Sequence, residues 1–86
     1  MEVEYTSEAV EDLKYWKKHN NTILLQRIRQ LIESISETPY QGISKPEPLK
    51  HNLTGCWSRR INKEHRIVYE VVDSKIYILS LKGHYK

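Results

Sequence analysis

The spacing of apolar residues changes part-way along the chain, and this change limits the fold more than any other feature. Between residues 7 and 37, apolar side chains recur with the period of one helix face. From residue 56 to residue 81 they alternate with polar ones or form short runs, as in the strands of a sheet. Helices that precede strands, instead of alternating with them, predict an α+β fold.

Two helices are expected in the first part of the chain. The first covers about residues 7–20 and is capped by Thr6 or Ser7. Its acidic first turn and basic last turn are explained by the helix dipole and indicate no catalytic role. The second covers about residues 22–37 and ends before a Thr-Pro pair, because proline disfavours the helical conformation of the preceding residue.

The part with period two predicts three strands, at residues 56–61, 65–72 and 76–81. Residues 3–5 also alternate and are interpreted as an edge strand, whereas residues 39–48 hold all three prolines and predict an extended loop. The expected fold is therefore two N-terminal helices packed on a small antiparallel sheet. It forms a single domain that spans residues 1–86.

Composition offers little for disulfide, membrane or metal chemistry. The single cysteine, Cys56, cannot form an internal disulfide, which favours a reducing compartment and a cytoplasmic location. It lies in a predicted strand beside Trp57, where we expect a packed and inert thiol. Four scattered histidines without a zinc motif predict no metal site and no cofactor. No apolar run approaches the roughly 20 residues of a membrane helix.

Positive charge is concentrated in the second half of the chain. Residues 45–86 hold nine of the fourteen Lys and Arg residues and four acids, a net charge of +5, whereas residues 1–44 have a net charge of −2. A basic half of this kind is typical of a nucleic-acid contact, although a plain solvated basic face would explain it equally well.

A carboxylate lies within this basic region, where two prolines brace Glu47 in a rigid loop. The cations that follow it include Lys50, Arg59, Arg60 and Arg66. With the histidine and tyrosine near the end of the chain, these residue types suit metal-free cleavage of RNA. A base accepts the proton of the attacking 2′-hydroxyl, an acid protonates the departing 5′-oxygen, and cations stabilise the charge on the phosphate. DNA lacks that hydroxyl and would not be cut in this way.

The turn at residues 62–64 decides how two of these cations lie. A three-residue loop would place Arg60 directly opposite Arg66 on one face of the sheet, and a two-residue loop would place them on opposite faces. Like charges opposed across strands destabilise a sheet, so such a pair would be explained by a bound anion. The sequence leaves both loop lengths open.

The run KPEPLKHNLTGCWSRRINKEHRIVYEV and the terminal His84-Tyr85 pair resemble the YoeB toxins, a branch of the RelE-like ribonucleases of bacterial toxin–antitoxin pairs. The resemblance covers nearly the whole chain. Pro-Glu-Pro-Leu-Lys, Trp-Ser-Arg-Arg, Glu-His-Arg and His-Tyr all occur in the order and spacing of the family. It implies the RelE-like fold, of the microbial-ribonuclease type.

The resemblance also implies roles for four residues. Glu47 would act as the general base and His84 as the general acid. Arg66 would stabilise the scissile phosphate, and Tyr85 would help to shape the site.

Three cations complete the predicted RNA-binding set. Lys50 and Arg60 match further family positions around the phosphate, and Arg59 is expected to contact backbone phosphates. Gly83 departs from the family pattern and is expected to loosen the tail that must place His84.

The function implied is that of a toxin of a type II toxin–antitoxin pair, an endoribonuclease that cleaves messenger RNA in the ribosomal A site without a metal. The implied partners are mRNA on the 70S ribosome, a YefM-like antitoxin that folds on binding, and a second copy in a homodimer. A non-catalytic RNA- or ribosome-binding module is the alternative; it explains the cations but not the Pro-Glu-Pro brace. A DNA-binding repressor is disfavoured, because neither predicted helix is a basic recognition helix.

Overall fold

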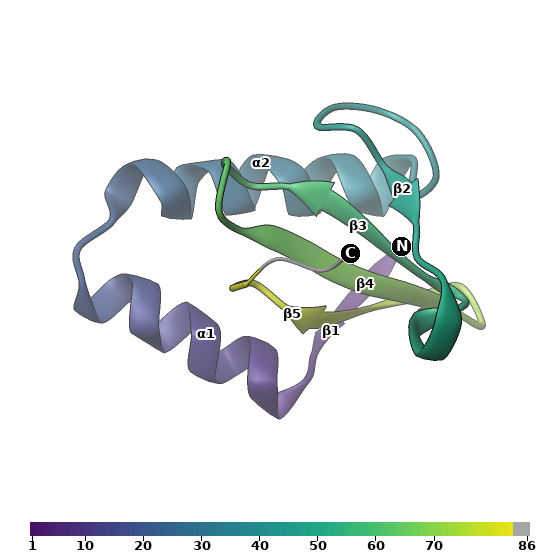
Figure 1. The fold of residues 1–86 in the computed structure, drawn as a ribbon, viewed down its shortest axis with the longest axis horizontal. Coiled ribbons are helices and arrows are strands. Elements are labelled where there is room, and N and C mark those ends of the chain that lie inside the picture. The colour runs from purple at the N-terminus through teal and green to yellow at the C-terminus, as the bar shows by residue number, and fades with distance from the viewer. Residues whose placement is uncertain (84–86) are drawn as a thin grey trace.

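The computed structural model describes residues 1–83 of the 86-residue chain, and within them two helices cover one face of a sheet (Figure 1). The helices are α1 (Ser7–Lys18) and α2 (Thr22–Glu37). The strands are β1 (Glu2–Tyr5), β2 (Glu47–Pro48), β3 (Cys56–Arg60), β4 (Arg66–Val72) and β5 (Lys75–Ser80), in the sheet order β1-β5-β4-β3-β2. A short 3-10 turn, His51–Leu53, lies between β2 and β3. In the part of the chain so described, no helix is long and apolar enough to cross a membrane.

Both helices start at side-chain caps. Thr6 caps α1, where its Oγ1 accepts a hydrogen bond from the Ala9 N–H at 3.2 Å. Asn21 caps α2, where its Oδ1 accepts from the Leu24 N–H at 3.2 Å. The predicted end of α2 is confirmed, but α1 ends at Lys18, before the predicted residue 20. The chain leaves the helical conformation there because Asn20 is left-handed, with φ at 51°.

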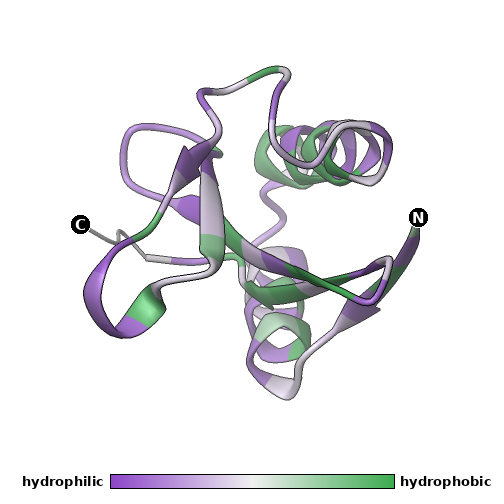
Figure 2. Cartoon of the chain, turned by 90° about the vertical axis from the view of Figure 1, so that its right-hand side faces the viewer, coloured by the Kyte–Doolittle hydropathy of each residue, from purple (hydrophilic) through white to green (hydrophobic). Residues whose placement is uncertain are grey.

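The core lies between the helices and one face of the sheet. It includes Trp16 of α1, Leu24, Ile28, Leu31 and Ile35 of α2, and Ile67, Tyr69, Ile76 and Ile78 of the central strands. Figure 2 shows the hydrophobic side of α2 turned toward the sheet. Burial of each aliphatic side chain contributes about 1.5–3 kcal/mol to the free energy of folding, so this face of the sheet stabilises the fold.

The sheet is mixed rather than wholly antiparallel, which corrects one part of the predicted fold. The β3–β4–β5 meander is antiparallel as predicted, and the predicted edge strand is present as β1. However, β1 pairs with β5 in parallel, with Glu2 opposite Lys75 and Tyr5 opposite Ile78. Strand direction cannot be inferred from alternation alone, because both directions give the same period of two.

The β3–β4 turn contains three residues, which resolves the alternatives left open by the sequence. The Ile61 N–H donates to the His65 carbonyl at 2.9 Å, and Asn62 Oδ1 accepts from the N–H groups of Glu64 and His65, each at 2.8 Å. Arg60 is therefore paired directly with Arg66.

Arg59 is fully buried on the helix-covered face. A guanidinium has five N–H groups, and here they make five hydrogen bonds: from Nε to the Tyr69 hydroxyl (3.2 Å), from Nη1 to Ser34 Oγ (2.6 Å) and the Ile43 carbonyl (3.4 Å), and from Nη2 to the carbonyls of Thr38 (2.6 Å) and Gln41 (2.8 Å). No donor is left for a phosphate. The structure therefore contradicts the predicted RNA contact of Arg59, because strand alternation turns it away from its neighbour Arg60.

The partners of Arg59 explain how a buried charge is tolerated. They include the carbonyl of Thr38 at the C-terminal end of α2, where the helix dipole favours a cation. Gly42 lets the loop come this close, since a Cβ there would lie 3.1 Å from Arg59 Nη1, and its φ of 121° is one that other residues rarely adopt. Burial raises the pKa of Tyr69 despite the nearby guanidinium, so the phenol stays protonated and donates to the Pro39 carbonyl at 2.6 Å. Arg59 thus fastens residues 38–43 to the sheet.

We expect Arg59→Leu to lower the free energy of unfolding by about 3–5 kcal/mol, because several buried carbonyls and hydroxyls would lose their donor. Arg60→Gln is the matched control on the exposed side of the same strand and should change stability by no more than about 0.5 kcal/mol. Urea unfolding of both variants measures the difference. Equal midpoints for Arg59→Leu and the parent would show that Arg59 does not hold the loop.

Candidate active site

Three of the predicted site residues, Glu47, Arg60 and Arg66, share the outer face of the sheet, the side turned away from the helices. Ile67 and Tyr69 of β4 point into the core, so Arg66, between the loop and Ile67, points to the outer face. Arg60 lies opposite Arg66 and shares that face. Glu47 shares it too, because Glu47 pairs with Ser58. Three of the predicted residues are thus brought together by strand register.

Ser58 connects the two sides of this site. Glu47 lies directly opposite Ser58, and Arg66 Nη1 donates to Ser58 Oγ at 3.3 Å. Adjacent strands lie about 4.8 Å apart, so the backbones of β2 and β4 are separated by about 10 Å. The sequence analysis did not single out Ser58. Its position in Trp-Ser-Arg-Arg, two residues before Arg60, would have placed its hydroxyl on the same face of the strand as Arg60.

Arg66 is a buried cation with an unused donor. The residue is only 8% exposed, and its Nε finds no hydrogen-bond partner within residues 1–83. Leaving a buried donor unsatisfied costs about 1–3 kcal/mol. A second guanidinium, that of Arg60, is paired with it across the strands, which adds repulsion. Both costs would be relieved by an anion bound at this point.

Glu47 is exposed on the two-residue strand β2. The segments that precede and follow this strand contain residues with strained backbone conformations. Ser44 and Lys45 precede it with φ values of 65° and 52°, and His51 follows with 61°. Such left-handed conformations cost non-glycine residues roughly 1–2 kcal/mol each. The loop is fixed in place by the Arg60 N–H, which donates to the Ser44 carbonyl at 3.0 Å. Strain of this kind is typical of functional segments.

The remaining predicted residues lie near this face or outside the described chain. Lys50 is exposed just after β2, at the residue that precedes the 3-10 turn, and its side chain makes no capping hydrogen bond there. The Arg66 N–H donates to the Gly83 carbonyl at 2.9 Å, which brings the end of the described chain beside the site. His84 and Tyr85 lie outside the described residues, and His84 follows Gly83 by one peptide bond.

Gly83 was expected to loosen the tail that places His84; the tail itself lies outside the described residues, but Gly83 makes two hydrogen bonds through its backbone. Besides the carbonyl contact with Arg66, its N–H donates to Nδ1 of His65 at 3.0 Å. Its φ of 99° suits glycine in particular. Both backbone groups of Gly83 are therefore held.

Neither Cys56 nor a cluster of metal ligands adds a reactive group to the site within the described residues. Cys56 is buried, and burial, with a smaller contribution from Glu70, raises the pKa of its thiol, as expected for an inert cysteine. Across residues 1–83, no three His, Cys, Asp or Glu side chains are grouped closely enough to hold a metal ion.

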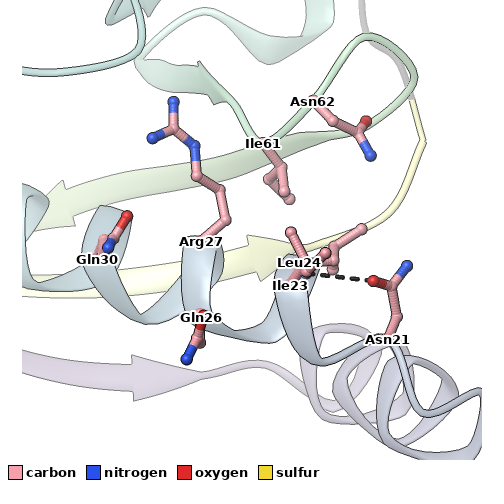
Figure 3. A pocket seen from close by; sticks show the side chains of 8 residues that line it. All are labelled: Asn21, Ile23, Leu24, Gln26, Arg27, Gln30, Ile61 and Asn62. Atoms are coloured by element: carbon pink, nitrogen blue, oxygen red, sulfur yellow. Dashed lines mark hydrogen bonds between the residues drawn. The ribbon is translucent and has the colours of Figure 1, made fainter.

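A pocket of about 310 Å³ lies away from the site, between the start of α2 and the β3–β4 turn (Figure 3). Ile23, Leu24 and Arg27 line it on one side and Ile61 and Asn62 on the other. No predicted catalytic residue lines it. The candidate site is instead a surface, which suits a polymeric substrate better than a small one.

Two helices on one face of a five-stranded mixed sheet, with cations and an exposed glutamate on the other, define a protein of the RelE-like toxin class. The chain matches the family model of the YoeB-like toxins of bacterial type II toxin–antitoxin systems over residues 5–85, and it belongs to that family. The toxin YoeB of Escherichia coli strain K12 is 44% identical over 85 residues, which cover 99% of this chain and all of the relative.

Solved structures agree with this assignment. A YoeB/ParE toxin from Agrobacterium tumefaciens superposes with a TM-score of 0.93 at 36% identity, covering 99% of this chain and 100% of the other. The toxin in a YoeB-YefM complex from Staphylococcus aureus superposes with a TM-score of 0.88 at 46% identity, covering 99% and 98%. A YoeB dimer from the same organism gives a TM-score of 0.88 at 45% identity, with the same coverage.

Binding of single-stranded RNA to the outer face should weaken with salt. Three cations, Lys50, Arg60 and Arg66, imply a log–log slope of about −2, at roughly −0.7 for each phosphate contact. Arg60→Gln should make the slope shallower by about 0.7. Lys75→Gln should leave it unchanged, because Lys75 pairs with Glu2 at 3.2 Å on β5 and β1, at the other edge of the sheet. Fluorescence anisotropy of labelled RNA between about 50 and 300 mM salt measures the slope. A flat response would rule out a phosphate-binding outer face.

Proposed function

We propose that this toxin is a metal-independent endoribonuclease that cleaves messenger RNA in the ribosomal A site. The observation that carries the proposal is the Arg66 side chain. A guanidinium that is buried, lacks a partner for Nε in the described chain and opposes a second arginine is adapted to an anion. Glu47 on the same face adds a base to that anion site.

The proposed reaction uses the two sides of the site in turn. Glu47 accepts the proton of the 2′-hydroxyl, whose oxygen attacks the adjacent phosphorus. The bond from phosphorus to the 5′-oxygen breaks, and His84 gives that oxygen a proton. The products are a 2′,3′-cyclic phosphate and a 5′-hydroxyl end. Arg66, with Arg60 and Lys50, stabilises the negative charge that builds up on the phosphate oxygens.

The shape of the site supports a ribosomal substrate. Only a few polar side chains of this face, among them Glu47, Lys50 and Arg60, are exposed, so the protein offers little surface for reading an RNA sequence. Placing the reacting groups supplies much of a catalyst's effect, and a ribosome that already holds the mRNA can provide that placement. Tyr85, next to the proposed acid, would complete the contacts to the RNA.

The proposed partners follow from the relatives. The complex from S. aureus supports a YefM-like antitoxin for this toxin, and the dimer from that organism supports a homodimer. We propose a cytoplasmic location, where translating ribosomes and the antitoxin are both present.

Glu47→Gln should slow cleavage of ribosome-bound mRNA by about 10²–10⁴-fold, because the amide cannot accept the proton. Stability should change by less than about 1 kcal/mol, since the side chain is exposed. Asp73→Asn, a similar change in the exposed β4–β5 turn, is the control and should cut at the parent rate. Mapping of new RNA 5′ ends within translated codons gives the readout. A non-catalytic binding module would arrest growth with either variant and generate no new ends with the parent.

Arg66→Met should separate activity from stability. The cleavage rate should fall by about 10²–10³-fold, because the charge on the transition state loses its main cation. The free energy of unfolding should change by less than about 1 kcal/mol, because the loss of the hydrogen bond to Ser58 is offset by the removal of a buried donor without a partner and of a like-charge contact. Single-turnover cleavage and urea unfolding test the two parts. A large loss of stability would show that Arg66 is structural and would remove it from the mechanism.

A further inference from the structure

We infer that His65 is a positioning residue for the C-terminal histidine. Its Nδ1 accepts the Gly83 amide proton and so fixes the residue from which His84 extends. The inference rests on the proposed function, in which His84 is the general acid. It assigns a role to a histidine that does not itself meet the RNA.

The chain beyond β5 is held first by α1. The Leu81 N–H donates to Asp12 Oδ2 at 2.9 Å, and the Leu81 carbonyl accepts from Trp16 Nε1 at 3.0 Å. Leu81 is itself fully buried. Both of its backbone groups are thus bonded to side chains of one helix, although β5 has already ended at Ser80.

The second attachment is at Gly83, and it comes from the start of β4. Arg66 donates its backbone N–H to the Gly83 carbonyl, and His65 accepts from the Gly83 N–H. The residue that holds the proposed phosphate is therefore also bonded to the segment that carries the proposed acid. His65 supplies the only contact to the Gly83 N–H that the described chain shows.

The His65 ring is itself held in place. It packs edge-to-face on the Trp16 ring, with 4.7 Å between centroids, and its backbone N–H and carbonyl close the β3–β4 turn. Because Nδ1 accepts the Gly83 proton, the imidazole carries its own proton on Nε2. Trp16 therefore acts twice: it bonds to Leu81 and it orients the ring that bonds to Gly83.

A tail needs such fixation to do chemistry. Terminal residues fray unless they are tied down. A general acid must come within about 2.6–3.2 Å of the atom that it protonates, and a displacement of about 1 Å can cost roughly 10² in rate. Removing the His65 bond frees the Lys82–Gly83 peptide plane and leaves Gly83 held through its carbonyl alone.

The test compares two substitutions of similar shape. His65→Asn keeps an acceptor, Oδ1, close to the position of Nδ1, whereas His65→Leu has none, and both lose the ring contact with Trp16. We expect His65→Leu to slow single-turnover cleavage of ribosome-bound mRNA by about 10–100-fold. Its affinity for the ribosome should stay within about twofold, and His65→Asn should recover most of the rate. Amide hydrogen exchange at Gly83 should be faster in His65→Leu than in His65→Asn.

The outcomes separate the inference from the proposed function. Equal cleavage rates and equal Gly83 exchange in the parent and His65→Leu would overturn the inference, while the proposed function would stand. Equal loss of rate in the Asn and Leu variants would also overturn it, since shape rather than the acceptor would then matter. If His65→Leu fails to fold, His65→Gln, whose acceptor lies one bond further out, takes its place with the same expectations. A parent protein that does not cut mRNA would overturn the proposed function and this role with it.

Discussion

The buried guanidinium of Arg59 is the interaction on which the rest of the architecture depends. It joins the C-terminal end of α2, the loop that follows and the centre of β3 through five hydrogen bonds. The loop of residues 38–46 has other contacts with the sheet, from Tyr69 to the Pro39 carbonyl and from the Arg60 N–H to the Ser44 carbonyl, but Arg59 makes most of the hydrogen bonds that hold residues 38–43. The short strand β2 is the continuation of the loop, so the placement of Glu47 beside Ser58 follows from a contact made on the opposite face.

The two neighbouring arginines of β3, Arg59 and Arg60, thus have different roles. Arg59 is satisfied at every donor and stabilises the fold, whereas Arg60 is exposed and paired with another cation. Arg66 carries a further cost, because its Nε has no partner in residues 1–83. Proteins tolerate such costs mainly where a ligand relieves them. The cations of the outer face are therefore better explained by what the toxin binds than by what holds it together.

Much of the fold followed from the sequence, because local rules determine it. The proline after Thr38 ended α2 as expected, and the switch to period two located β3, β4 and β5. What local rules could not supply were contacts between distant residues. The parallel direction of β1 depends on a strand more than seventy residues away. Arg59 was interpreted as a phosphate contact because the sequence of a basic run does not distinguish a buried arginine from an exposed one. Only the pairing register shows that Arg59 points into the core.

The parallel pairing of β1 with β5 has a consequence for aggregation. Residues 76–81, Ile-Tyr-Ile-Leu-Ser-Leu, are uncharged and rich in residues that favour strands, the composition of segments that pair with copies of themselves. As an edge strand, β5 would offer an open row of backbone donors and acceptors to another molecule. β1 occupies that edge and presents Glu2 and Glu4 at the new boundary of the sheet. The first few residues of the chain therefore cover the edge of its last strand. A toxin that lost them would be prone to aggregate through pairing of β5 strands from different molecules.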